Sequence, residues 1–104
     1  MDKAKFYIGQ IIEHKLFNYR GVIFAVDDSM QLSEQWYQQV AKSRPPKDKP
    51  WYHVLVDGYQ HTTYVAERNL IAATQPVPIN HPLLETYFDK FEDDKYIQLP
   101  EHYH

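Results

Sequence analysis

The chain has 104 residues, a formal net charge of −3 and no cysteine. At this length a single domain with one core is expected, and the lack of cysteine excludes a disulfide framework, a thiolate zinc site and a cysteine nucleophile. The longest apolar run, Val22 to Val26, is far too short to cross a bilayer, and the first residues lack the apolar stretch of a signal peptide. The sequence therefore predicts a soluble cytoplasmic protein without a membrane partner.

The charge is unevenly distributed along the chain. Residues 1–53 carry eight Lys or Arg and six Asp or Glu, which gives +2, whereas residues 54–104 carry three and eight, which gives −5. Surfaces that bind DNA neutralise phosphates with cations. A generic DNA-coating protein is therefore disfavoured, and DNA contacts are expected from the first half of the chain.

Two strands are predicted near the N-terminus, over residues 10–16 and 20–26, on either side of a short polar turn. Gly9 and Gly21 lie at or near the start of these runs, where glycine permits the tight bends with which a small curved barrel begins. Within the turn, Asn18 tolerates left-handed backbone angles.

The second of these strands is apolar on both faces. Val22, Phe24 and Val26 alternate along it and are predicted to face the core. Ile23 and Ala25 make the opposite face apolar too, so another segment of the chain should cover that face.

A short helix is predicted over residues 34–43. Ser33 is its expected N-cap, and Pro45–Pro46 ends it. Residues 28–50 then form an insertion between two strands of the barrel.

The remaining strands are predicted from three further runs of residues. The strand over 51–56 returns over 61–65, and a single helical turn at 66–69 leads to a last short strand over 70–73. A second helix is expected near 82–91, because Pro82 suits a first helical position.

No catalytic or metal-binding pattern is found in the sequence. The six histidines lack a recognisable ligand spacing. The neighbouring carboxylates of Asp27–Asp28 and Asp93–Asp94 would point to opposite faces of a strand, so they are interpreted as a strand-ending turn and a solvated acidic tail. The protein is therefore predicted not to be an enzyme and to use no cofactor or metal.

Cations and aromatic residues are combined in one predicted loop. Residues 42–49 carry four cations and precede Trp51, a mixture that can grip phosphate and stack on a base. The alternative is a solvated loop that Trp51 anchors to the barrel. Recognition of a methyl group needs an apolar contact at a base edge, for which Trp51 and Tyr19 are candidates. The predicted DNA-binding residues are Lys15, Arg20, Lys42, Arg44, Lys47, Lys49 and Trp51.

Two histidines are expected within the barrel. His14 and His53 are predicted to lie on neighbouring strands, with at least one ring partly buried against Phe24, Tyr52 or Tyr64. Burial disfavours the charged imidazolium, so the pKa of such a histidine should fall below its usual value unless a carboxylate pairs with it.

Several separated motifs resemble those of one protein family, in the same order and over about residues 5–74. They are Ile8-Gly9-Gln10, His14-Lys15, Tyr19-Arg20-Gly21-Val22-Ile23, Asp27, the run 50–56 and the run 63–70. This pattern resembles the YccV-like, hemimethylated DNA-binding domain, also called the heat-shock protein Q family. The segment from His81 to Ile97 is similar to a longer version of the domain, including the one appended to certain F-box proteins.

The resemblance implies a fold, a function and a set of partners. The implied fold class is mainly β, a small SH3-like antiparallel barrel of about five strands, here with a short helical insertion and a C-terminal helix. Residues 5–74 would form the barrel, and residues 75–104 an extension that packs on it. The implied function is binding of hemimethylated duplex DNA without catalytic residues. In bacterial members the resemblance implies an influence on replication initiation and, as a heat-shock or stress-response protein, on degradation by the Lon protease.

A second hypothesis is a protein-interaction adaptor, or specificity factor, that brings clients to an ATP-dependent protease such as Lon. It depends on the acidic and aromatic segment 87–96, a composition that resembles docking segments. The alternative is that Tyr87, Phe88 and Phe91 simply cap the barrel. Exposed edge strands would also allow a homo-oligomer.

Overall fold

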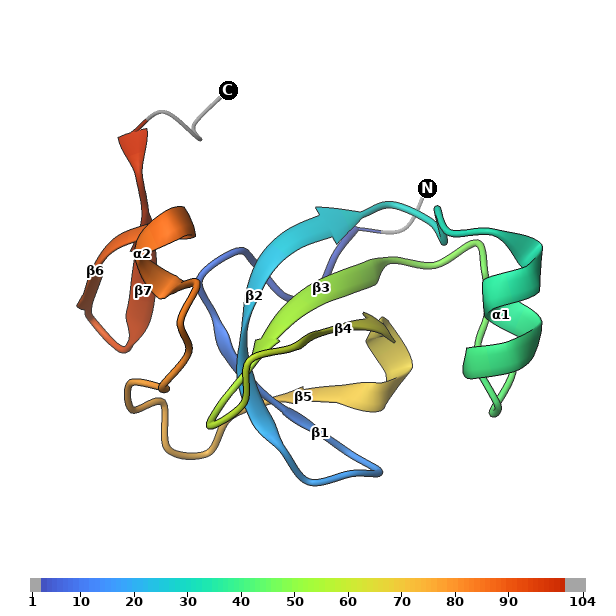
Figure 1. Ribbon diagram of the computed structural model, residues 1–104, viewed down its shortest axis with the longest axis horizontal. Coiled ribbons are helices and arrows are strands. Elements are labelled where there is room, and N and C mark those ends of the chain that lie inside the picture. Colours follow the sequence, from blue (N-terminus) through green and yellow to red (C-terminus); the bar gives the residue numbers. More distant parts are fainter. Residues whose placement is uncertain (1–2, 101–104) are drawn as a thin grey trace.

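The computed structural model describes residues 3–100, in which a curved five-stranded antiparallel sheet is accompanied by a two-stranded hairpin (Figure 1). The strand order of the larger sheet is β4-β3-β2-β1-β5. Its strands are β1 (Ile11–His14), β2 (Arg20–Asp27), β3 (Trp51–Val56), β4 (Thr62–Ala66) and β5 (Leu70–Ala72). The predicted mainly β class with antiparallel strands is confirmed.

The larger sheet bends strongly but does not close into a barrel within residues 3–100. Its two end strands, β4 and β5, are joined by one turn of 3-10 helix, η1 (Glu67–Asn69), but form no ladder with each other. The three residues of β5 pair with β1 instead. The single helical turn is confirmed, and the closed barrel is not.

Buried apolar side chains lie on both faces of the larger sheet. The cluster on the inner face consists of Ile12, Ile23, Tyr52, Val54, Val65 and Leu70. The cluster on the outer face joins Ile11, Val22 and Leu55 of the sheet to Ile79, Phe88 and Tyr96 of the C-terminal segment. Both apolar faces are covered, as expected, but the C-terminal segment covers the face of Val22 and not the face of Ile23, for which the cover was predicted.

A β-bulge decides which residues of β2 face which cluster. The register between β2 and β3 shifts between Ile23 and Ala25, and a bulge interrupts the alternation of side chains along a strand. Ile23 and Val26 pack on the inner face, whereas Val22 and Phe24 pack on the outer face. The prediction that Val22, Phe24 and Val26 share one face is wrong, because strict alternation takes no account of a bulge.

Helix α1 (Glu34–Val40) lies in the connection between β2 and β3, as predicted. The Ser33 side chain accepts a hydrogen bond from the Trp36 backbone N at 3.0 Å, which confirms the N-cap. Tyr37 forms a third buried cluster with Trp51 and Ala66, and this cluster fastens α1 to one end of the sheet. No helix within residues 3–100 is long and apolar enough to cross a membrane.

The C-terminal segment differs from the prediction. The helix expected near 82–91 is limited to α2 (Leu84–Tyr87), and a hairpin of β6 (Phe88–Glu92) and β7 (Lys95–Gln98) follows it. Asp93 and Asp94 form the hairpin turn with φ values of 55° and 65°, as a type I′ turn requires. The longer helix is wrong, and Asp93 and Asp94 are exposed, as predicted, but in a hairpin turn and not in a tail. The turn is hard to predict because an Asp-Asp pair carries a weaker turn signal than Asn-Gly or Asp-Gly.

Candidate nucleic-acid interface

The basic loop after α1 is fastened to the helix by its arginine. Arg44 Nη1 donates to the backbone oxygens of Tyr37, Gln38 and Ala41 at 3.3, 3.1 and 3.4 Å, where the last carbonyls of a helix lack intrahelical partners. The Tyr37 hydroxyl donates to the Pro45 backbone oxygen at 2.7 Å. Arg44 therefore caps the end of α1 through its Nη1.

The lysines of this loop lie at its surface. Lys47 pairs with the Glu34 carboxylate and lies 4.4 Å from the centre of the Tyr37 ring, which is a cation–π contact. Lys42 and Lys49 are exposed. Arg44 is exposed as well, so the loop presents positive charge through its lysines and through the part of Arg44 that does not cap α1.

Trp51 is part of the core beneath the loop. It is 1% exposed, and its indole Nε1 donates to the Pro46 backbone oxygen at 3.0 Å. The rings of Trp36 and Tyr64 pack against it with centroid distances of 5.9 and 5.2 Å. These contacts match the anchoring role that the sequence left open for Trp51.

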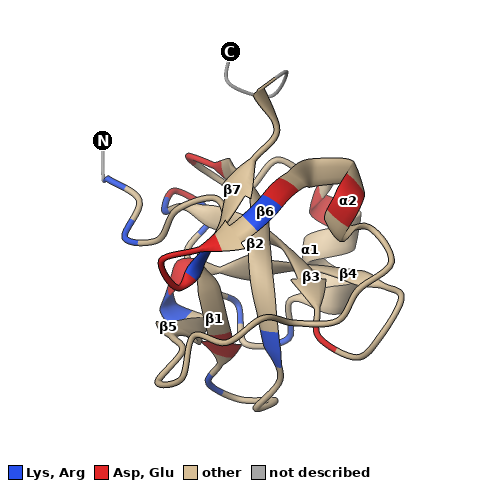
Figure 2. Cartoon of the chain, turned by 90° about the vertical axis from the view of Figure 1, so that its left-hand side faces the viewer, with Lys and Arg blue, Asp and Glu red and all other residues tan. Residues whose placement is uncertain are grey.

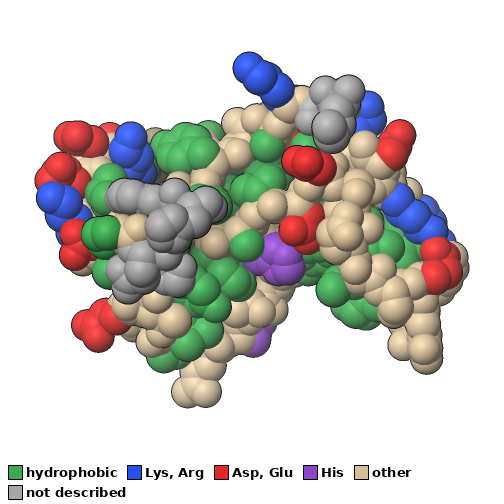
Figure 3. All heavy atoms as spheres, turned by 90° about the horizontal axis from the view of Figure 1, so that it is seen from above, with side chains coloured by type: hydrophobic (Ala, Val, Ile, Leu, Met, Phe, Trp, Pro, Cys, Tyr) green, Lys and Arg blue, Asp and Glu red, His purple; other side chains and the backbone are tan. Residues whose placement is uncertain are grey.

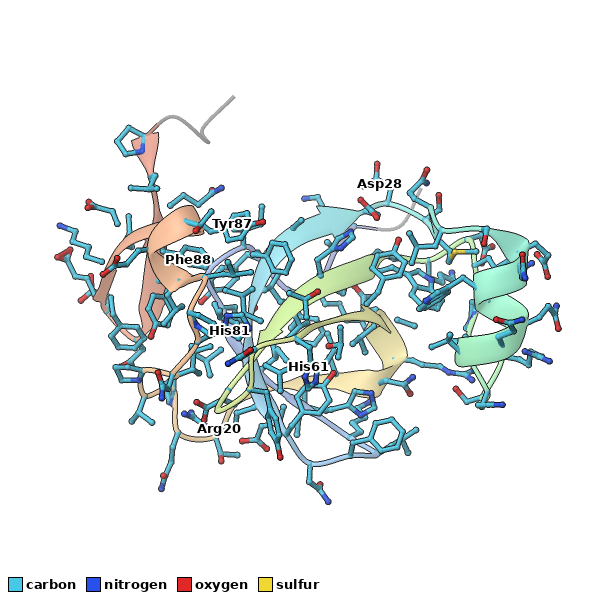
Figure 4. The ribbon with its side chains drawn as sticks, in the orientation of Figure 1. Arg20, Asp28, His61, His81, Tyr87 and Phe88 are labelled. Atoms are coloured by element: carbon cyan, nitrogen blue, oxygen red, sulfur yellow. The ribbon has the colours of Figure 1, made fainter. Side chains whose placement is uncertain are left out.

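Arg20 lies at the start of β2 and clamps the segment that leads to the C-terminal part (Figure 4). Its guanidinium donates to the backbone oxygens of Gln75, Val77 and Pro78 at 3.3, 3.3 and 3.2 Å and pairs with Asp57 at 3.3 Å. Of the seven predicted DNA-binding residues, those within 42–51 lie around α1. Arg20 lies elsewhere, and its guanidinium is bonded to the three backbone oxygens and to Asp57.

The turn between β1 and β2 presents apolar side chains to solvent. Phe17 is 73% exposed and Leu16 is 58% exposed. The turn is held from within, because the His14 Nδ1 accepts hydrogen bonds from the backbone N of Leu16 and of Phe17 at 3.1 and 3.2 Å. Asn18 has a φ of 59°, as expected for this position. The first strand therefore ends at His14 rather than at residue 16, and Lys15 stands exposed at the base of an apolar tip.

The His14 ring is buried inside this turn. It is 5% exposed and lies 4.7 and 5.1 Å from the ring centres of Phe17 and Tyr19. Burial lowers the pKa of His14 below its usual value, as predicted. The expectation that His14 and His53 lie on neighbouring strands is wrong, because β2 lies between β1 and β3.

His53 belongs to a hydrogen-bonded group on the outer face of the sheet. Its Nε2 lies 3.1 Å from Asp27 Oδ2, and the same carboxylate oxygen accepts from the Tyr64 hydroxyl at 2.6 Å. The His53 ring also packs against Tyr64 and Phe24, which confirms the predicted aromatic neighbours. Burial and the hydrogen bond to Asp27 raise the pKa of Tyr64 well above its ordinary value. Tyr64 is thus fixed in position beside α1.

A groove of about 600 Å³ separates α1 from the β1–β2 turn. Figure 3 shows the surface hollowed between the lobe that contains α1 and the rest of the molecule. Trp36 and Val40 line the groove on the α1 side, Leu16 and Phe17 line it on the side of the turn, and β4 forms its floor. Among the described residues that line it, histidines aside, Lys42 alone is charged. The groove itself is therefore apolar.

The opposite end of the molecule is acidic. Figure 2 shows Asp and Glu concentrated on α2 and on the hairpin of β6 and β7. These residues are Glu85, Asp89, Glu92, Asp93 and Asp94, against Lys90 and Lys95. Because carboxylates repel phosphates, a nucleic acid is better accommodated at the end that carries α1.

Sequence reasoning missed the apolar tip and the groove. The sequence pattern predicts Leu16 in the first strand and Phe17 in a polar turn. The available signal was a pair of large apolar residues directly before Asn18, a turn position where polar residues are usual. Within residues 3–100, no group of three or more His, Asp or Glu side chains is placed to hold a metal ion.

Comparison with known protein families supports the resemblance seen in the motifs. The family model described as "hemimethylated DNA-binding protein YccV like" matches residues 4–95. The match includes the whole five-stranded sheet and α1, and it continues through α2 and β6 into the hairpin. The chain therefore belongs to the YccV-like family of hemimethylated DNA-binding proteins.

Proposed function

We propose that the protein binds duplex DNA with the end of the molecule that carries the β1–β2 turn and the basic loop after α1. Family membership supports DNA binding, and the acidic hairpin at the other end supports this choice of surface. Lys15, Lys42, Lys47 and Lys49 contact phosphates in this proposal. Such contacts position a protein on DNA but carry no information about the bases.

The observation that carries the proposal is the exposed apolar tip, which is next to Lys15 and lines the same groove as Lys42. A methyl group on a base is recognised by an apolar contact in a groove of the duplex. Phe17 is 73% exposed and stands on a turn that His14 holds rigidly. Tyr19 is less suited, because its hydroxyl is hydrogen-bonded to Thr63 Oγ1 at 2.7 Å. We propose that Phe17 makes the contact that favours hemimethylated DNA.

Three residues of the predicted set have a different role in this proposal. Arg20, Arg44 and Trp51 support the interface through the fold, since the polar groups of their side chains bond to backbone carbonyls. Their replacement would weaken DNA binding by loosening the linker, the end of α1 or the loop.

The test is a titration of one duplex in unmethylated, hemimethylated and fully methylated form, at two salt concentrations, read by fluorescence anisotropy. Binding should weaken steeply with salt, and the hemimethylated form should bind most tightly. The double variant Lys15→Glu/Lys42→Glu should weaken all three forms by about tenfold or more. Lys90→Glu, on the acidic hairpin, is the matched control and should change affinity by less than about twofold.

Two results would overturn the proposal. Equal affinity for the three forms would remove the hemimethylated preference while leaving general DNA binding. An equal loss from Lys90→Glu and from the double variant would mean that net charge, and not this surface, determines binding.

The alternative function, an adaptor for an ATP-dependent protease such as Lon, is less supported by the segment that suggested it. Phe88 and Tyr96 of the segment 87–96 are buried against the sheet. Deletion of residues 76–104 should therefore expose the outer cluster and unfold the chain. A deletion variant that stays folded would support both the docking hypothesis and the proposed division into a barrel over 5–74 and an extension over 75–104.

We also propose that the curved sheet is SH3-like. The strand order and the 3-10 turn between β4 and β5 support this assignment. An experimental structure with a different order of strands would contradict it.

A further inference from the structure

A different ligand fits the floor of the groove between α1 and the β1–β2 turn. We propose that the open edge of β4 binds an extended segment of a partner protein as an added antiparallel or parallel strand, with an acidic residue of that segment beside Lys42. This peptide site goes beyond the proposed DNA binding and makes separate predictions.

The backbone of β4 is paired on one side only. β4 lies at the end of the sheet order and forms its ladder with β3. Within residues 3–100, the backbone groups of Thr62–Val65 make no hydrogen bond to the chain outside this ladder, whereas Ala66 is the N-cap residue of η1. In a ladder, alternate residues direct their N–H and C=O groups away from the neighbouring strand. Every second residue of Thr62–Val65 therefore offers an unpaired N–H and C=O at the edge of the sheet.

The side chains around this edge suit a single strand. Residues from both faces of β4 line the groove, including Thr63 on one face and Tyr64 on the other, so the groove follows the edge. Phe17 stands on one side of it and Val40 on the other, and both are exposed. Alternate side chains of an added strand point to opposite faces. One set would contact the β1–β2 turn and the other set α1.

The same geometry argues against the other occupants. The β1–β2 turn and α1 flank this edge on both sides, which obstructs the broad edge of a second copy of the sheet. Duplex DNA needs several cations at the contact, whereas Lys42 is the single charged residue among the described residues that line the groove, histidines aside. A peptide that is apolar at alternate positions and carries one carboxylate matches this apolar lining and its one cation.

The proposal is tested with blocked synthetic peptides of about seven residues that alternate Val and Thr and end in Asp. Binding is followed by NMR of the labelled full-length protein. Shift changes should centre on residues 62–66, and the outward amides of β4 should exchange more slowly. Two N-methylated peptides are compared, one methylated at its odd-numbered residues and one at its even-numbered residues. Only one of these sets of amides faces β4. Methylation of that set should abolish binding, and methylation of the other set should change the affinity by no more than about twofold.

Variants on α1 provide a matched pair. Val40→Glu places a carboxylate in the groove and should weaken peptide binding by about tenfold or more. Gln39→Glu adds the same charge on the same helix at a residue that does not line the groove, and it should have less than about a twofold effect. A peptide ending in Lys instead of Asp should bind more weakly, and Lys42→Glu should reverse that order.

Shift changes that centre away from β4 would overturn the peptide site. Equal binding of the two N-methylated peptides, or equal effects of Val40→Glu and Gln39→Glu, would also overturn it. Failure of every peptide to bind at millimolar concentration would also reject it. These results are separable from those for DNA, since loss of peptide binding with intact binding of hemimethylated duplex leaves the proposed function standing.

Discussion

Gly9 and Tyr96 are in backbone contact, although nearly the whole chain separates them. The Tyr96 backbone N donates to the Gly9 oxygen at 2.9 Å, and Gly9 has a φ of +97°. A Cβ atom built on Gly9 would lie 2.0 Å from the Tyr96 backbone oxygen. Absence of a side chain at Gly9 is therefore what allows the C-terminal hairpin to dock against the start of β1.

Replacement of Gly9 by Ala should destabilise the protein strongly. The methyl group meets backbone rather than a movable side chain, and the positive φ is unfavourable for alanine, so we expect a loss of about 3 kcal/mol or more. The melting temperature should fall by about 10 °C or more. Gly58→Ala is the matched control, because Gly58 also has a positive φ but its Cβ would meet no atom within 4 Å. It should cost only about 1 kcal/mol, and an equal cost at both sites would contradict the docking argument.

The stability of the protein should depend on pH through His14. Burial lowers the pKa of His14 in the folded state below the usual 6.5, so the unfolded chain takes up the proton first. The contribution of neutral His14 is present above about pH 6.5 and is lost as pH falls through the lowered folded pKa. Urea denaturation between pH 7 and pH 5 should show this decline.

The variant His14→Asn separates this effect from that of the other histidines. The Asn side-chain oxygen can accept the hydrogen bonds from the turn but does not titrate in this range. The decline in stability between pH 7 and pH 5 should be smaller in the variant than in the parent protein. An identical decline would show that His14 is not the group responsible.

The Arg20 clamp should be sensitive to geometry rather than to charge. Arg20→Lys keeps the positive charge but cannot reach three carbonyls and Asp57 together. We expect a loss of about 1–2 kcal/mol and faster proteolysis within residues 74–80. Unchanged stability and cleavage would show that these long contacts contribute nothing measurable.

The exposed tip should matter for recognition and not for folding. Phe17→Ser removes a largely exposed ring, so stability should change by no more than about 0.5 kcal/mol. The affinity ratio between hemimethylated and unmethylated duplex should move toward one. Val77→Ser, at another exposed apolar residue, is the control and should leave that ratio unchanged. A preserved ratio in the Phe17 variant would assign methyl recognition to another group.

Local patterns in the sequence were sufficient for most of the elements. The β-rich run 51–56 is strand β3, and Ser33 caps α1 because its side-chain oxygen meets a backbone N–H three residues later. These features depend on neighbours in the chain, so they can be read without knowledge of the fold. The family motifs are likewise contiguous runs of residues, and they identified the family that the comparison confirms.

Other features of the protein depend on contacts between residues far apart in the sequence, and only the tertiary structure reveals them. The bulge between Ile23 and Ala25 arises from pairing with β3, so alternation along β2 alone placed Val26 on the same face as Val22 and Phe24, which is wrong. Segment 88–98 became a hairpin because its apolar residues cover the outer face of the sheet. The commitment of Arg20 and Arg44 to backbone carbonyls follows from the positions of those carbonyls in space. A cation's residue type shows that it can bind phosphate, but its neighbours in the fold determine whether its donors are already engaged.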